Sequence, residues 1–157
     1  MKPTLIQNIP SLLIPKELYK EEKIQEYWNV LHPDSQSEYL GKDDLGSFFL
    51  LYPKIDKEDS IHEISVLYKE FMNKFPNNEH AVCVNVYENG VNLLVIKNRE
   101  IAYAGYFRIS LKEDVLYHLA NVTQQFFDDV PAIIFAYQQL PATVLRLLGN
   151  YYEMKKI

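Results

Sequence analysis

The side chains that most often do chemistry in metal sites are few in this chain and poorly spaced. The four histidines and the single cysteine are His32, His62, His80, His118 and Cys83. No two histidines have the close spacing that places both on one metal ion, and a zinc site needs about four His, Cys or carboxylate ligands. We expect no metal site. Local hydrogen bonds explain most of these histidines, and His32 suits the negative end of a helix dipole.

No residue has the surroundings of a catalytic nucleophile. Cys83 lies within an apolar run, whereas a reactive thiolate needs a helix N-terminus or a neighbouring cation. Ser60 and Ser110 each precede a glutamate by three residues, a spacing typical of a capping box at the start of a helix. The Gly-x-Ser-x-Gly elbow of esterases is absent from the sequence. We therefore predict no catalytic residue.

Acidic pairs and glycines are also better explained by structure than by chemistry. Asp43-Asp44, Glu113-Asp114 and Asp128-Asp129 lie in expected loops or at helix starts, where free N–H groups favour carboxylates. The five glycines form neither a Walker motif nor a dinucleotide fingerprint.

The composition narrows the class of protein. The chain has 157 residues, 16 Lys and Arg against 21 Asp and Glu, and a net charge of -5. This balance argues against nucleic-acid binding, which needs an excess of basic residues on one face. The lone cysteine fits a reducing compartment, and no apolar run reaches the ~20 residues of a membrane span. We expect a cytoplasmic protein with no membrane segment and no secretory signal.

The second half of the sequence has clear periodic patterns. Three short apolar runs, 81–87, 91–96 and 101–109, predict strands, and an amphipathic helix follows, capped by Ser110 and Glu113. Asn89-Gly90 between the first two strands predicts a hairpin with a type I′ turn. A further strand over 132–137 and a helix after Pro141 complete a β-β-β-α-β-α unit.

The first half has a simpler pattern. Residues 4–14 are extended, 16–31 are helical, 47–52 form a buried strand, and a helix capped by Ser60 and Glu63 runs to Phe75. Pro76 and the two asparagines after it are the best break in the chain. We predict an α/β protein with a mixed sheet, divided into a reduced β-α-β-α half over 1–76 and a β-β-β-α-β-α half over 77–157.

The second half, 80–157, resembles the repeating unit of the actin-like ATPases, which have a ribonuclease H-like fold. Short segments also resemble an uncharacterised bacterial family of degenerate actin-like proteins. These segments are Ser11-Leu12-Leu13-Ile14-Pro15 with Leu18-Tyr19, Phe75-Pro76, and Glu113-Asp114-Val115-Leu116-Tyr117. The resemblance implies an actin-like fold over most of the chain.

The sequence departs from that of active actin-like ATPases at the positions that bind the nucleotide. In active members the first hairpin turn of each half carries an Asp, a Gly and a small hydroxyl residue, which hold Mg²⁺ and phosphate. The matching turn here is Glu88-Asn89-Gly90-Val91, and Tyr137-Gln138-Gln139-Leu140 replaces the Gly-Gly pair that lets the backbone approach adenosine. Residues 1–76 supply only about two strands in place of a full meander. Glu88, Asn89 and Gly90 are thus weak candidates for binding a nucleotide.

Three functions remain open from the sequence. The first is a non-catalytic interaction module of actin-like fold, without a cofactor, which acts through a protein partner or by self-association. The second is nucleotide binding without efficient hydrolysis through Glu88 and Gly90. The third is a small enzyme whose site forms only in three dimensions. A sheet that lacks strands leaves an exposed edge, and such edges favour pairing with another chain.

Overall fold

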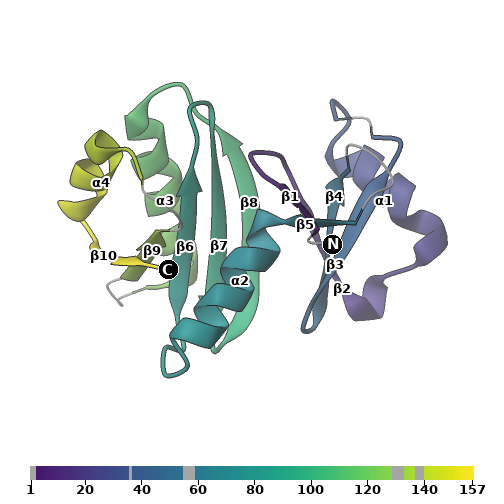
Figure 1. Ribbon diagram of the computed structural model, residues 1–157, viewed down its shortest axis with the longest axis horizontal. Coiled ribbons are helices and arrows are strands. Elements are labelled where there is room, and N and C mark those ends of the chain that lie inside the picture. The colour runs from purple at the N-terminus through teal and green to yellow at the C-terminus, as the bar shows by residue number, and fades with distance from the viewer. Residues whose placement is uncertain (1–2, 36, 55–58, 129–132, 137–139) are drawn as a thin grey trace.

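The computed structural model describes residues 3–35, 37–54, 59–128, 133–136 and 140–157. Its larger part is a five-stranded sheet in the order β10-β9-β6-β7-β8 (Figure 1). The meander is antiparallel, β9 runs parallel to β6, and β10 runs parallel to β9. The elements are β6 (Ala81–Val86), β7 (Gly90–Lys97), β8 (Glu100–Arg108), α3 (Lys112–Phe126), β9 (Ile133–Ala136), α4 (Ala142–Gly149) and β10 (Glu153–Lys156). The predicted β-β-β-α-β-α order is confirmed.

The smaller part is built from short strands in two sheets. β2, β4 and β3 form an antiparallel sheet in that order, and β1 pairs in parallel with β5. The elements are β1 (Thr4–Ile6), β2 (Leu12–Pro15), the 3₁₀ turns η1 (Lys16–Leu18) and η2 (Glu21–Lys23), α1 (Ile24–Leu31), β3 (Leu40–Leu45), β4 (Phe48–Pro53), β5 (Ser60–His62) and α2 (Glu63–Lys74).

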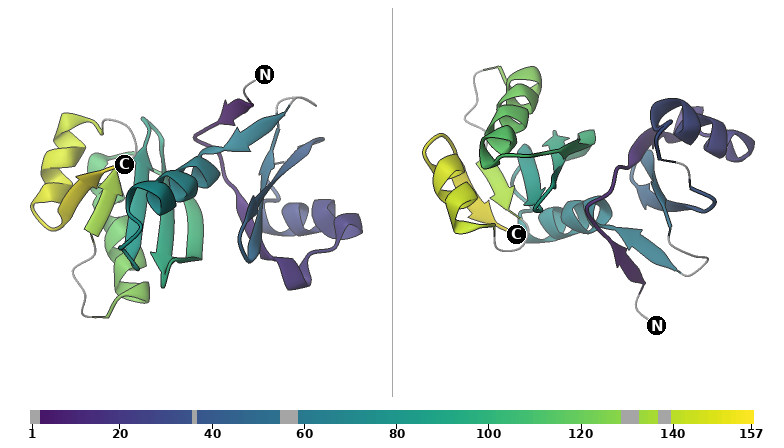
Figure 2. Two further views of the ribbon diagram at one scale, coloured as in Figure 1. Left: turned by 60° about the horizontal axis from the view of Figure 1, so that its bottom comes forward. Right: turned by 90° about the horizontal axis from the view of Figure 1, so that it is seen from above.

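The five-stranded sheet is covered on both faces. Along β6, Cys83 packs on the side of α2, whereas Val82 and Val84 pack with residues of α3 and α4. This alternation is the period of two that a strand imposes on its side chains. Figure 2 shows α2 between the large sheet and the smaller part, with α3 and α4 on the far face.

One apolar core joins the two predicted halves. Leu50 of β4, Phe71 of α2 and Leu94 of β7 belong to the same buried cluster, and each is fully inaccessible. A second cluster lies between the large sheet and α3 and α4, and a third packs Trp28 of α1 against β2 and β4. The division at residue 76 stays a prediction, because α2 contributes to a core that extends across it.

The two hairpin turns of the meander differ from the prediction. The β6–β7 turn closes between Tyr87 and Gly90, whose N–H and carbonyl are 2.8 Å apart, so Glu88 and Asn89 are its central residues. Positive φ occurs at neither Asn89 nor Gly90, so the type I′ assignment was wrong. The next turn, between β7 and β8, has positive φ at both Asn98 and Arg99, as a type I′ turn requires.

Arg99 explains why a turn without glycine is used there. Its guanidinium donates hydrogen bonds to carbonyls at and beyond the end of α2, including those of Phe75 at 3.2 Å and Pro76 at 2.5 Å. Carbonyls at a helix C-terminus lack partners within the helix and carry negative charge, so a cation stabilises them.

Both predicted capping boxes are also corrected. At α3, Asp114 rather than Glu113 accepts from the backbone N–H groups, those of Ser110 at 2.7 Å and Leu111 at 2.9 Å. Both hydrogen bonds lower the pKa of Asp114, and the bond from Leu111 contributes the larger part. At α2, Ser60 lies in β5, and the cap is the ring nitrogen Nδ1 of His62, which accepts from Ile64 N at 3.2 Å.

Three further differences concern strands and helix length. The first half contains more than the two strands expected, because residues 4–14 form β1 and β2 in different sheets, and Asp43-Asp44, expected in a loop, lie in β3. The predicted helix over 16–31 consists of two 3₁₀ turns followed by the shorter α1. The last helix ends at Gly149, and the chain then forms β10, a strand that was not predicted.

Candidate functional site

The predicted site residues lie at the β6–β7 turn, where the two parts of the molecule meet. Glu88 and Asn89 are exposed, whereas Gly90 is buried at the start of β7. Val91, which follows, is fully inaccessible and packs in the core with α3 and α4. Only exposed Glu88 and Asn89 therefore offer side chains of this turn to solvent.

The face of Gly90 is occupied by two polar side chains of the chain itself. Asn8, in the loop between β1 and β2, donates from Nδ2 to Asn89 Oδ1 at 2.9 Å and accepts from the Tyr106 hydroxyl at 3.3 Å. A Cβ atom on Gly90 would overlap Asn8 Oδ1 and would lie 2.6 Å from the Tyr106 hydroxyl. Asn8 has a φ of 55°, a left-handed conformation that asparagine tolerates better than most residues. Gly90 is thus covered by one side chain from each half of the protein, whereas Glu88 and Asn89 remain exposed.

A buried carboxylate lies behind this turn. Glu63, the first residue of α2, is fully inaccessible. Its Oε1 accepts from Asn8 N at 3.1 Å and from Asn92 Nδ2, and its Oε2 accepts from Asn85 Nδ2 at 2.6 Å and from the Tyr87 hydroxyl. We call these four donors and Glu63 the Glu63 cage. Hydrogen bonds to a carboxylate and the positive end of the helix dipole both stabilise the charge there.

Sequence reasoning missed this cage, although one signal for it was present. Asn85 and Asn92 are the polar residues within strands that are otherwise almost entirely apolar, and they face each other in the β6–β7 register. A pair of buried amides on one sheet face requires polar partners. The partner is Glu63, which had been interpreted as a helix cap.

A second polar cluster lies at β3, β4 and the start of α2. The Asp43 carboxylate accepts from the Tyr52 hydroxyl at 3.0 Å, from His62 N at 3.0 Å and from Ser65 Oγ at 2.5 Å. Burial lowers the pKa of His62 to about 4, and burial raises the pKa of Tyr52. The His62 ring contacts Ile64 N and the Ile9 carbonyl, so no hydrogen bond joins it to Ser65. The cluster lacks the Ser–His contact of a catalytic triad.

The remaining reactive groups are structural. Cys83 is buried, and burial raises the pKa of its thiol, which removes the thiolate. His118 stacks on Phe107 with ring centroids 4.2 Å apart, and His80 accepts from Asn98 N at 3.3 Å. Within the described ranges, no three His, Cys, Asp or Glu residues are grouped as a metal site would require.

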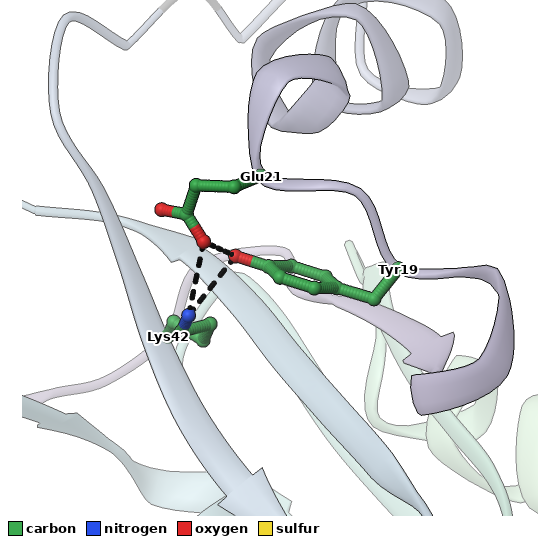
Figure 3. A network of polar contacts seen from close by, with 3 residues as sticks. All are labelled: Tyr19, Glu21 and Lys42. Carbon is green, nitrogen blue, oxygen red and sulfur yellow. Dashed lines mark hydrogen bonds and ion pairs between the residues drawn. The ribbon is translucent and has the colours of Figure 1, made fainter.

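On the surface, a small polar network fixes η2 to β3 (Figure 3). Lys42 Nζ contacts Tyr19 Oη at 3.0 Å and Glu21 Oε2 at 3.1 Å, and the Tyr19 hydroxyl donates to Glu21. The ammonium group also lies 5.0 Å from the centre of the Phe49 ring. Hydrogen bonds from Tyr19 and, to a smaller extent, from Lys42 lower the pKa of Glu21. The network ties two elements together.

Comparison with known proteins identifies the fold. Residues 50–127 match a family described as "Protein of unknown function (DUF3822)". A crystal structure at 1.85 Å of a Bacteroides thetaiotaomicron protein "with actin-like ATPase fold and unknown function" superposes with a TM-score of 0.79 at 14% identity, over 98% of this chain. The chain has an actin-like ATPase fold. The expected resemblance to an uncharacterised bacterial family of this fold is thereby confirmed.

The extent of these matches sets what they show. This chain spans 66% of the length of the Bacteroides protein, and at this level of identity the likeness concerns the fold alone. No curated protein matches the chain. Among the described helices, none combines the length and the apolar character needed to cross a bilayer. Residues 137–140 replace the Gly-Gly pair that approaches adenosine in active members. Of these, Tyr137, Gln138 and Gln139 lie outside the described residues, and Leu140 is buried.

Proposed function

We propose that this chain is a non-catalytic interaction module of actin-like fold, which lacks a complete nucleotide site and acts through protein contacts. The observation that supports this most directly is the packing of Asn8 and Tyr106 against Gly90. The resemblance implies that an active relative holds phosphate against this turn with backbone N–H groups. Here protein atoms lie against the same backbone, so a phosphate would first have to displace them.

The side chains of the turn support the same proposal. Val91 lies where the resemblance implies a hydroxyl for phosphate, and it is buried against α3 and α4. Glu88 is exposed and extends the side chain by one methylene relative to the Asp of active members. A carboxylate that manages Mg²⁺ must be held in a fixed geometry, which an exposed glutamate on a turn does not provide.

The buried polar groups near the turn are already engaged. Glu63 accepts four hydrogen bonds, and the His62 ring contacts two backbone groups. A general base needs a free lone pair within reach of a substrate. Neither group offers one, which favours a role without catalysis.

We place the protein in the cytoplasm, acting without a cofactor.

The direct test is calorimetric titration of the chain with Mg-ATP at millimolar concentration. We expect heats of dilution alone, both for the wild type and for Glu113→Ala, a control at an exposed carboxylate on α3. A saturable one-to-one isotherm for the wild type would contradict the proposal. In that event Glu88→Ala decides between sites: if it abolishes binding, the turn holds the nucleotide, as the alternative of binding without hydrolysis requires.

A further inference from the structure

An apolar groove lies on the smaller part of the molecule, far from the β6–β7 turn. It has a volume of about 470 Å³ and is formed by β2, η1 and α1, with Leu12, Ile14, Leu18, Tyr27 and Leu31 among its apolar walls. Figure 2 shows α1 in the smaller part, on the side that faces away from α4, and Leu18 and Leu31 at the walls of the groove are exposed. The groove is therefore open to a partner.

Large hydrophobic side chains are unusually exposed around this groove. Leu18 is 60% exposed and Leu31 is 58% exposed at its walls, and the neighbouring Val30 is 71% exposed. Apolar side chains scattered singly on a surface are ordinary, but several next to an apolar hollow are typical of a protein interface. The surface thus contains both exposed apolar side chains and an apolar groove that could receive such side chains from a partner.

The geometry of β2 restricts how a partner binds. β2 is an edge strand of its sheet, and consecutive residues from Leu12 to Pro15 line the groove. Because side chains of a strand alternate between faces, a groove lined by consecutive residues runs along the strand edge. Pro15 has no N–H to donate, which blunts this edge against the addition of a strand. Contact through side chains is favoured instead.

Two charges at the rim indicate which partner fits. Glu17 and Lys20 both line the groove, and neither takes part in an ion pair within the described part of the chain. In a two-fold interface, residue i of one copy meets residue j of the other and the reverse. A second copy docked so that Glu17 meets Lys20 would therefore form this ion pair twice.

We propose that the groove is the interface of a symmetric homodimer, in which Leu18 and Leu31 of each copy enter the groove of the other and Glu17 pairs with Lys20 across the axis. The net charge of -5 opposes most contacts between copies, whereas this patch presents one charge of each sign. The inference rests on the proposed interaction role and names its partner as a second copy of this chain.

Sedimentation velocity tests the homodimer, with chain concentration raised from about 1 µM to about 500 µM. We expect the wild type to approach twice its mass of 18.5 kDa, and Leu18→Ser/Leu31→Ser to stay monomeric. Glu17→Lys alone and Lys20→Glu alone create like-charge pairs and should each weaken the dimer about tenfold or more. The double reversal Glu17→Lys/Lys20→Glu should restore it, and Glu113→Lys on α3 should leave it unchanged.

Each alternative outcome is informative, because all of these positions are exposed and the variants are checked for folding by urea denaturation. A wild type that stays monomeric throughout would refute the homodimer. A dimer that survives Leu18→Ser/Leu31→Ser would place the interface elsewhere. Failure of the double charge reversal would rule out the symmetric pairing. None of these results changes the Mg-ATP titration, so failure of the dimer and failure of the proposed function are separable.

Discussion

Replacing Glu63 by glutamine tests whether the Glu63 cage holds the two parts of the protein together. Glutamine has nearly the same shape, but one carboxylate oxygen becomes an NH₂ group that only donates. If the NH₂ replaces Oε2, it faces the amide of Asn85 and the hydroxyl of Tyr87. A hydroxyl can rotate and accept, whereas the Asn85 NH₂ cannot. Asn85 keeps its bond to the Tyr87 hydroxyl at 2.7 Å, but its other buried N–H loses its acceptor. If the NH₂ replaces Oε1, both donors there lose theirs.

The expected cost follows from these hydrogen bonds. A buried donor without an acceptor costs about 1–3 kcal/mol, and the remaining bonds lose the strengthening that a charged acceptor gives. We therefore expect Glu63→Gln to lower the free energy of unfolding by about 2–4 kcal/mol, a large part of the ~5–15 kcal/mol typical of a domain.

Urea denaturation followed by circular dichroism measures this loss. Glu70→Gln is the matched control, because Glu70 lies on the same helix and forms an exposed i,i+4 ion pair with Lys74. Such pairs contribute about 0.5 kcal/mol, so the control should stay close to the wild type. If Glu63→Gln also unfolds within about 0.5 kcal/mol of the wild type, the cage does not stabilise the fold as argued.

Three further predictions concern single positions. Gly90→Ala should destabilise by about 1–3 kcal/mol because its Cβ would overlap the side chains of Asn8 and Tyr106, whereas Gly149→Ala, with open space around it, should not. Urea midpoints compare the two variants. The pKa of His62 falls from 6.5 to about 4 on folding, so below about pH 6.5 the unfolded chain takes up the proton first and stability is lost toward pH 4. The wild type should lose about 3 kcal/mol more than His62→Asn between about pH 7 and pH 4, and equal losses would refute the role of the ring. Asn98→Gly should leave the stability unchanged or raise it, because glycine tolerates the positive φ there. Arg99→Gly should lower the free energy of unfolding by about 1–3 kcal/mol, because the hydrogen bonds to the carbonyls at the end of α2 are lost. Equal unfolding midpoints for the two variants would contradict the role of the Arg99 side chain.

The sequence predicted those elements whose pattern is local. The strands of the meander follow from short apolar runs, and α3 follows from helical periodicity, which places its apolar residues on one face. β4 was found for the same reason, as a short apolar run ended by a proline. The mixed α/β class and the β-β-β-α-β-α order follow from the succession of these elements.

What was missed depends on contacts between distant segments. β3 contains Lys42, Asp43 and Asp44, and nothing local distinguishes it from a loop; Asp43 becomes a buried acceptor only when α2 packs beside it. β10 forms because β9 offers it a parallel edge.

The candidate site shows the same limit. Glu88, Asn89 and Gly90 were placed correctly at one hairpin turn, but the turn type was wrong. Asn8, which is distant in the sequence, bonds to this turn, and no local pattern reports that contact. The Glu63 cage joins residues from both predicted halves, and no spacing in the sequence reports such a meeting. Whether the turn binds a ligand stays a prediction.

The contact between Asn8 and Gly90 also affects the order in which mutations can act. While Asn8 covers the turn, changing Glu88 to Asp or Val91 to Ser exposes no new backbone to a phosphate. Either change alone therefore brings no gain, and Val91→Ser also weakens a buried core position. Only after substitutions clear both Asn8 and the Tyr106 hydroxyl from Gly90 do the other two positions acquire an effect. Two side chains, one from each half, thus hide the effects of substitutions at the turn, and one-at-a-time mutagenesis of the turn would overlook that dependence.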